Sequence, residues 1–306
     1  MARAALGYLP ALLAAALVVY AIAAGGYFVA LAGFALIYAV FVSGLNIFMG
    51  YAGQASFGQN AFAAIGGYTS AVLTTAYDVA PLPALAAGVA GAIVCAVLIG
   101  YLTLRLKGHY LAMATLAIGL IVYEITVQWQ SVTNGYAGIS GIPPLGIAGF
   151  EAASDRAQLV LLSALVALSG SEEAARALGV DVARYKLAAF VVSAVYAAVA
   201  GSLFVHVVGF VSPEVFGMNM VILGFTMLYV GGIGTITGPL VGAIVINLLP
   251  EAVRGLKDYQ DLVYGAALIL ILIYAPGGLA ALGWPKRTRP ARADTAAKLE
   301  PASVEP

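Results

Sequence analysis

Charged residues are scarce in this chain of 306 residues. Only 9% of them are Asp, Glu, Lys or Arg, whereas ordinary soluble domains carry about a quarter. The 14 basic and 14 acidic side chains cancel, so no excess of either sign indicates nucleic acid or an acidic partner. Because 62% of the residues are hydrophobic and the mean hydropathy is +0.99, the composition indicates a polytopic membrane protein.

Cysteine and histidine are almost absent. Cys95 is the single cysteine, which excludes an intrachain disulfide, and its apolar neighbours predict a packing role. His109 and His206 have no HExxH motif, Cys pair or carboxylate cluster beside them in the sequence, so we expect no metal site. The sequence also lacks a GxxxxGK[ST] phosphate loop and a visible pair of nucleophile and base. We therefore expect no enzyme and no cofactor in this chain.

Hydrophobic runs recur along the whole chain. A membrane helix needs about 20 mostly apolar residues. By this measure the fold class is all-α, a transmembrane helical bundle of about eight to ten spans. We expect the first span to be an uncleaved helix rather than a signal peptide. The expected spans are 6–24, 27–49, 55–76, 83–104, 109–130, 157–170, 187–209, 218–231, 236–250 and 260–281.

The distribution of Lys and Arg predicts the orientation of the bundle, since short cytoplasmic loops carry the excess of these residues. The loop 131–155 has neither and is expected outside, whereas both termini are expected in the cytoplasm. We divide the chain into a transmembrane domain, 1–284, and a disordered cytoplasmic tail, 285–306. The cytoplasmic side is assigned from Arg3, Arg105, Lys107, Arg176, Arg184, Lys186, Lys286, Arg287 and Arg289.

The segment from Gly50 to Leu73 is rich in glycine and uncharged polar side chains. We expect a broken helix near Gly50–Gly67 that lies inside the bundle. Small residues also mediate helix docking, so two interpretations remain open, docking and a solute pathway. The amides and hydroxyls favour the pathway, because each needs a partner or water. The predicted substrate pathway consists of Gln54, Ser56, Phe57, Gln59, Asn60 and Phe62.

The second informative segment is 171–186, between two predicted spans. Ser171 is a good N-cap, acidic residues follow in the first turn, and Gly179 ends the short amphipathic helix. A solvated connector is one interpretation, and a helix that enters a groove on another protein is the other. The residues that would make such a contact are Glu172, Glu173, Ala174, Ala175 and Gly179.

Glu124 and Glu214 are the acids that fall in or beside predicted spans in the outer half of the bundle. An acid at membrane depth is a functional candidate, so an ion-coupled secondary transporter is an alternative function.

Several motifs resemble a known family. Glu173-Ala174-Ala175, Gly179 and the RYKLAAF run at 184–190 resemble the coupling-helix signature of ABC-importer permeases. The rest of the chain resembles branched-chain amino acid permeases, specifically the M-type subunit of the high-affinity importer. The motifs are GYAGQASFGQNAF at 50–62, GIPP at 141–144, GFVSPEVF at 209–216, GGIGTITGPLVGA at 231–243 and APGGL at 275–279.

This resemblance implies a permease that moves branched-chain amino acids across a bacterial inner membrane. Its implied partners are an H-type second permease subunit, two cytoplasmic ATPase subunits that bind the ATP, and a periplasmic substrate-binding protein. Related permeases carry urea or short amides, which remain an alternative. The chain departs from the family before the coupling segment, where only Ser169 and Gly170 stand in place of a basic cytoplasmic stretch.

Overall fold

The computed structural model describes residues 26–106, 108–144, 146–147, 150–151, 182–252, 265–266, 269–270, 273–275 and 277–280. The predicted spans 6–24 and 157–170, the segment 171–181 and the tail 285–306 lie outside the described residues.

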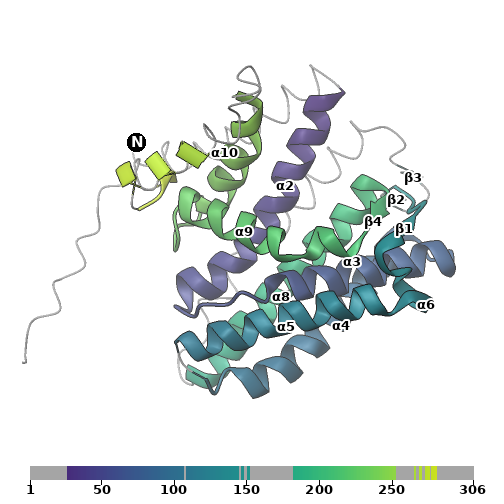
Figure 1. The fold of residues 1–306 in the computed structure, drawn as a ribbon, viewed down its shortest axis with the longest axis horizontal. Helices are drawn as coiled ribbons and strands as arrows, with labels where there is room; N and C mark the ends of the chain where they lie inside the picture. Colours follow the sequence, from purple (N-terminus) through teal and green to yellow (C-terminus); the bar gives the residue numbers. More distant parts are fainter. Residues whose placement is uncertain are drawn as a thin grey trace, which may run out of the picture.

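Helices make up most of the described chain (Figure 1). The α-helices are α2 (Tyr27–Leu45), α3 (Gln59–Ala76), α4 (Pro81–Thr103), α5 (His109–Gln128), α6 (Gln130–Thr133), α8 (Val182–Val208), α9 (Met218–Gly231) and α10 (Gly238–Ala252). A π-helix, η1 (Asn46–Tyr51), continues α2, and η2 (Gly135–Ala137) and η4 (Pro213–Phe216) are 3₁₀ turns.

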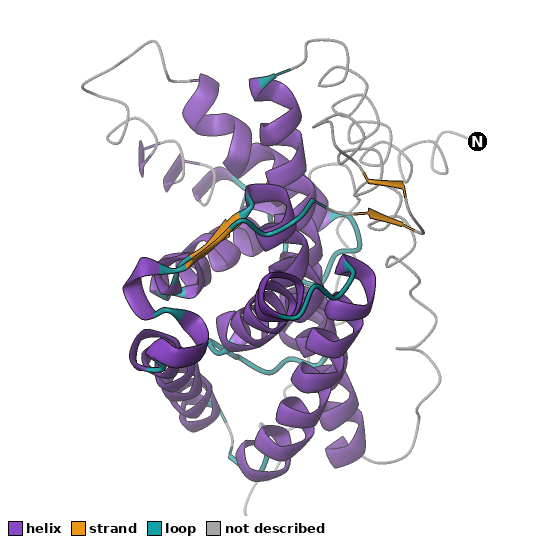
Figure 2. Cartoon of the chain, turned by 90° about the vertical axis from the view of Figure 1, so that its right-hand side faces the viewer, coloured by secondary structure: helices purple, strands orange, loops and turns teal. Residues whose placement is uncertain are grey.

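The strands are two residues long and lie in loops. β1 (Ile139–Ser140) pairs with β4 (Phe210–Val211), and β2 (Gly146–Ile147) pairs with β3 (Phe150–Glu151), both antiparallel. In Figure 1 all four strands lie at the right-hand end of the bundle, which is the end that faces the viewer in Figure 2.

Five described helices are long and apolar enough to cross a membrane. They span Tyr27–Tyr51, Pro81–Thr103, His109–Gln128, Lys186–Val208 and Pro213–Gly231. The first four match the predicted spans that begin at 27, 83, 109 and 187, and the fifth begins before the predicted 218–231 because it includes η4. The all-α, polytopic transmembrane prediction is therefore confirmed.

Helix α3 is central to the bundle and packs against α8, α4 and α5. Glycines permit this close packing. A Cβ on Gly66 would overlap the backbone of Ala198 in α8, and a Cβ on Gly201 of α8 would overlap the backbone of Ala63 in α3. Gly88 of α4 likewise lies against the backbone of Gly66. Gly66 of α3 therefore serves helix docking, together with Gly88 of α4 and Gly201 of α8.

The helix break predicted near Gly50–Gly67 lies at 52–58, between η1 and α3. Asn46 holds this region against the connection between α9 and α10. Its Nδ2 donates to the carbonyl of Thr235 and its Oδ1 accepts from the N–H of Gly234, both at 2.7 Å. Gly50 has no room for a side chain because the backbone of Gly234 lies against it. The π-helix η1, which directly precedes the break, thus packs against the turn between α9 and α10.

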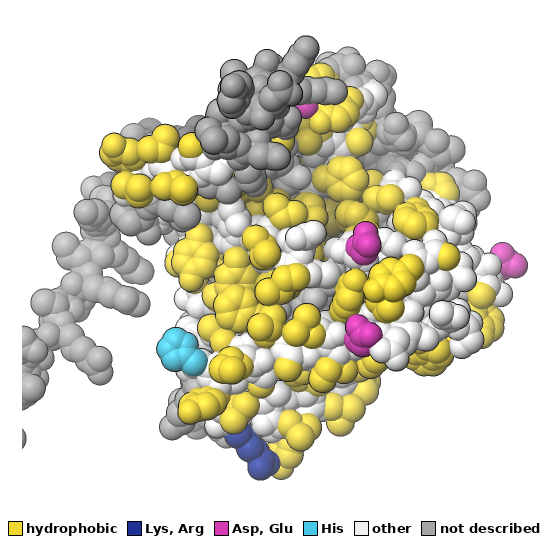
Figure 3. Space-filling model, in the orientation of Figure 1, with side chains coloured by type: hydrophobic (Ala, Val, Ile, Leu, Met, Phe, Trp, Pro, Cys, Tyr) yellow, Lys and Arg dark blue, Asp and Glu magenta, His cyan; other side chains and the backbone are white. Residues whose placement is uncertain are grey.

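The outward surfaces of α4 and α5 are apolar. Figure 3 shows a face on which hydrophobic side chains predominate and acidic side chains are few. Such a surface suits lipid or another membrane subunit. Large exposed side chains on these helices include Val94, Leu98, Tyr101, Leu102, Tyr110, Met113, Ile121 and Ile125.

Candidate functional site

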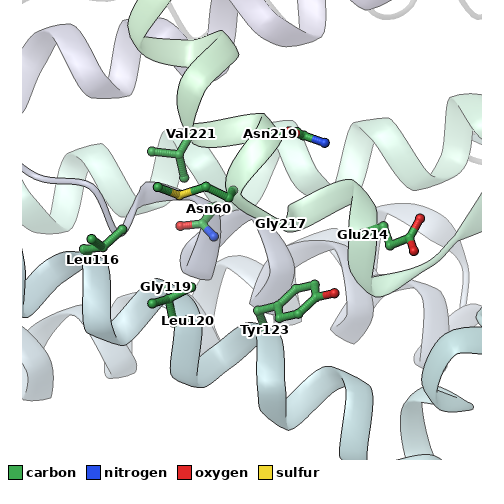
Figure 4. A pocket seen from close by; sticks show the side chains of 10 residues that line it. Asn60, Leu116, Gly119, Leu120, Tyr123, Glu214, Gly217, Asn219 and Val221 are labelled. Atoms are coloured by element: carbon green, nitrogen blue, oxygen red, sulfur yellow. The ribbon is translucent and has the colours of Figure 1, made fainter.

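A cavity of about 490 Å³ lies where α5, η4 and α9 meet the start of α3 (Figure 4). Its volume is in the range of small-molecule binding sites. The lining residues are Asn60, Leu116, Gly119, Leu120, Tyr123, Glu214, Gly217, Met218, Asn219 and Val221.

The start of α3 reaches the cavity because two backbone segments approach closely. The N–H of Phe57 donates to Thr115 Oγ1 of α5 at 3.0 Å, and Gly58 packs against the carbonyl of Thr115. One turn further along α5, Gly119 lies against the Asn60 side chain, where a Cβ would be 2.7 Å from Asn60 Oδ1. Asn60 is therefore held level with the middle of α5.

Asn60 is 4% exposed and is oriented by a single hydrogen bond. Its Nδ2 donates to the carbonyl of Phe216 at 2.8 Å, which identifies the other terminal atom as the amide oxygen. That Oδ1 has no hydrogen-bond partner among the described residues. A buried acceptor without a partner costs about 1–3 kcal/mol, and Asn60 bears this cost beside the cavity.

The cavity is polar at one end and aliphatic at the other. Figure 4 shows Glu214 and Tyr123 at one end, Leu116 and Val221 at the other, and Asn60 between them. Glu214 lies in η4 and is exposed in the single chain. A solute with both a charged group and an aliphatic group therefore fits this arrangement.

The N-terminus of α9 forms the roof of the cavity in the view of Figure 4. Gly217 precedes the helix and caps it with no side-chain hydrogen bond, and Met218 and Asn219 form the beginning of its first turn. The first N–H groups of a helix have no partner within the helix and carry a partial positive charge. This end of the cavity therefore suits an anionic group.

The other predicted pathway residues occupy different environments. Gln59 is buried against α8, where its Nε2 donates to the carbonyl of Ser193. Phe62 is 1% exposed and packs edge to face with Phe190 of α8. The Phe57 ring stacks on Phe225 of α9 with centroids 4.5 Å apart. Their place in a solute pathway stays a prediction.

Gln54 and Ser56 lie in the segment 52–58. The Gln54 amide bonds the carbonyls of Ala52 and Gly53, which keeps it on its own loop. Ser56 is 1% exposed, and its Oγ has no partner among the described residues. Of the six predicted pathway residues, Asn60 alone lines the cavity.

Sequence reasoning missed the α5 and α9 contributions to the cavity, among them Leu116, Tyr123 and Asn219. The sequence did contain one sign that the start of α9 is unusual. Glu214 and Gly217 interrupt an otherwise apolar run with an acid and a helix breaker, which indicates a helix that begins inside the membrane. The two acids predicted as functional candidates lie in different environments. Glu214 lines the cavity, whereas Glu124 accepts a hydrogen bond from Gln128 of its own helix at 2.7 Å.

The described residues contain no group of three His, Cys, Asp or Glu that could hold a metal ion. His206 is buried in α8 and links three segments, through Nδ1 to the carbonyl of Pro143 at 2.7 Å and Nε2 to Ser70 Oγ at 2.8 Å. Because a carbonyl only accepts, Nδ1 donates and Nε2 accepts from the Ser70 hydroxyl. His206 thus joins α8 to α3 and to the loop that contains Pro143.

Comparison with known proteins agrees with this architecture. A family described as "Branched-chain amino acid transport system / permease component" matches residues 27–169 and 163–272. The chain is 31% identical over 299 residues to the high-affinity branched-chain amino acid transport system permease protein LivM of Escherichia coli (strain K12), covering 82% of this chain and 69% of LivM. No solved structure matches.

A second permease of the same transport system name is also similar. LivH of Escherichia coli (strain K12) is 28% identical over 291 residues, covering 81% of this chain and 92% of LivH. A probable LivH of Methanocaldococcus jannaschii is 28% identical over 274 residues, covering 76% of this chain and 85% of that relative. With its multi-pass helical bundle and a cavity at the broken helices, the chain belongs to the permease family of branched-chain amino acid transport systems.

Proposed function

We propose that this chain is one of two permease subunits of an ABC importer and moves branched-chain or other hydrophobic amino acids by alternating access. The cavity carries this proposal, because it combines an aliphatic end with an acidic end halfway along α5. A Leu, Ile or Val side chain fits the aliphatic end, and the polar ends of the amino acid meet the polar lining. The names of the similar proteins support the same substrate class.

The exposed surface that carries Glu124 and Glu214 is the surface at which we place the second permease subunit. Both acids are exposed in the single chain and belong to helices that can cross a membrane. Acids at this depth avoid lipid and face the bundle interior, another subunit or a wet cavity. The translocation pathway therefore lies between the two permease subunits, with the cavity on this chain's side.

The energy comes from two separate ATPase subunits, and a periplasmic substrate-binding protein delivers the amino acid. The coupling segment proposed for the ATPases, with Glu172, Glu173, Ala174, Ala175 and Gly179, lies outside the described residues. We propose that the chain itself binds no cofactor and catalyses no reaction.

Uptake of labelled leucine and labelled urea by cells that carry the complete transporter tests the function. Leucine uptake that disappears when the ATPase gene is deleted is the expected result. Urea uptake without leucine uptake would instead assign the chain to the amide permeases. Leucine uptake that persists without the ATPase and disappears with Glu124→Gln would assign it to the ion-coupled transporters.

A further inference from the structure

We propose that Phe57 and Phe225 form a gate that closes the cavity on its cytoplasmic side. The stacked rings prevent the amino acid from leaving the cavity in that direction, and it passes when the rings separate. This inference rests on the proposed function and on the predicted orientation of the bundle, and it assigns two residues that control release.

The pair lies directly beyond the aliphatic end of the cavity. On α9, Phe225 is one helical turn after Val221, which lines the cavity, so the two side chains share a face of the helix. On α5, the N–H of Phe57 donates to Thr115 Oγ1 at 3.0 Å, and the next residue, Leu116, lines the cavity. Leu116 and Val221 form the aliphatic end (Figure 4). The two rings therefore meet where the cavity ends.

The direction from the cavity to the pair is also the direction of the predicted cytoplasm. Helix α5 begins at His109, next to the loop with Arg105 that the distribution of Lys and Arg assigns to the cytoplasm. The step from Tyr123 at the acidic end of the cavity to Leu116 at the aliphatic end leads back along α5 toward this loop. The pair thus closes the inner end, whereas Glu214 at the outer end is exposed.

The two rings are well suited to exclude water and polar solutes. Phe57 and Phe225 are stacked, with ring centroids 4.5 Å apart and planes that differ by 10°. Tyr229, one turn further along α9, continues the stack, and its ring centroid lies 6.4 Å from that of Phe225. Hydrophobic constrictions close a pathway because water does not wet them. The zwitterionic ends of an amino acid therefore meet a barrier at this point.

The contact between the rings can also be broken. An aromatic pair is held by dispersion and by the ring quadrupoles, so its separation leaves no hydrogen-bonding group unpaired. Phe57 belongs to the non-helical segment 52–58, between the π-helix η1 and α3, and Gly53 in this segment has a φ of +64°. A backbone change in this segment moves the Phe57 ring without breaking a helix. π-Helices are frequent at functional sites, which agrees with this role.

Access of a reagent to the cavity from each side of the membrane tests the gate in the assembled importer. The chain carries Cys95→Ala, which removes its only cysteine, and Leu116→Cys, which places a thiol at the aliphatic end of the cavity. After leucine uptake by this importer has been established, alkylation of the chain by a membrane-impermeant maleimide is measured in right-side-out and inside-out vesicles without ATP. We expect the thiol to react about tenfold faster from the outside than from the cytoplasmic side.

Substitutions of the pair test its role directly. Phe57→Ala and Phe225→Ala, each added to the Leu116→Cys chain, should raise the rate of alkylation from the cytoplasmic side about tenfold and leave the rate from the outside unchanged. Phe34→Ala is the matched control and should change neither rate. Its ring is also partly buried and contacts another phenylalanine, Phe204, at a centroid distance of 5.7 Å, but it packs against α8 rather than α9.

The contrary results separate the gate from the function. With both rings intact, alkylation that is as fast from the cytoplasmic side as from the outside overturns the gate, and this comparison holds even where the alanine variants fail to assemble. Assembled alanine variants that react no faster from the cytoplasmic side overturn it as well. Where Leu116→Cys itself removes uptake, Val221→Cys places the thiol on α9 at the same end of the cavity. An unmodified importer that takes up no leucine overturns the proposed function instead.

Discussion

Gly119 determines how closely α5 approaches the polar start of α3. A Cβ at this position would lie 2.7 Å from Asn60 Oδ1 and 3.3 Å from Nδ2, which is closer than side chains pack. The lack of a side chain therefore allows the cavity and the Asn60 amide to adjoin each other.

Gly119→Ala should consequently displace Asn60 from its bond with Phe216 or push α5 outward. We expect leucine uptake to fall about tenfold, equivalent to about 1.4 kcal/mol, with the importer still assembled. Gly91→Ala is the matched control, since its Cβ would meet only Ile65 Cγ2 at 3.7 Å. Uptake that is equal in the two variants would show that contact with Asn60 has no part in transport.

Asn60 and Gln59 show how far residue-level prediction extends. Both were predicted to line a solute pathway, and nothing in the local sequence separates them. In the structure Asn60 lines the cavity, whereas Gln59 bonds the carbonyl of Ser193 in α8. Successive residues of a helix point about 100° apart, so adjacent amides meet different neighbours. Which amide meets the cavity depends on how α5 and α8 pack, and local sequence does not contain that information.

At the scale of elements, the helices could be predicted where apolar runs are long and clearly ended. The predicted span 83–104 is observed as Pro81–Thr103, where proline residues begin the helix. The connection of η1 to the 232–237 turn was not predicted, because its two segments are 188 residues apart in the chain. A side chain that bonds a distant backbone leaves no periodic pattern in the sequence.

Asn46→Ala tests this connection. The substitution leaves the N–H of Gly234 and the carbonyl of Thr235 without their side-chain partner, and losing a typical hydrogen bond costs about 0.5–1.5 kcal/mol. We expect a lower midpoint of thermal unfolding, measured by circular dichroism on the purified complex. In the control Asn247→Ala, the lost bond joins the side chain only to Ala243 of the same helix. An Asn46→Ala midpoint no lower than that of the control would contradict a structural role for the connection.

At the scale of the whole molecule, the distribution of Lys and Arg in the loops predicts the orientation of the bundle. We predict both termini to be cytoplasmic. In a Cys95→Ala chain, a single cysteine at Ala2 or Ala302 should react with a membrane-impermeant maleimide only after the cells are opened. Reaction in intact cells would reverse the assignment.

The segment before the proposed coupling helix is predicted to differ from the family, because Ser169 and Gly170 stand where a basic stretch is expected. The two ranges of this chain that the family matches overlap at residues 163–169, next to this place. If 172–179 forms the predicted coupling helix, Gly179→Val should abolish uptake without unfolding the bundle, because a Cβ would obstruct the turn predicted to end that helix. Uptake and co-purification of the ATPase measure the two effects. If the unmodified chain retains no ATPase, a basic extension inserted after Leu168 should restore the complex, and failure of both chains to retain it would contradict the importer assignment.

The strand pair β1–β4 has a mechanical consequence. Ile139 and Val211 are paired across it, and the bond from His206 to Pro143 fastens the same loop to α8. Only Ser212 and Pro213 separate β4 from Glu214. Displacement of the loop around β1 would therefore be passed to Glu214, which lines the cavity, through the β1–β4 pairing and two residues of backbone.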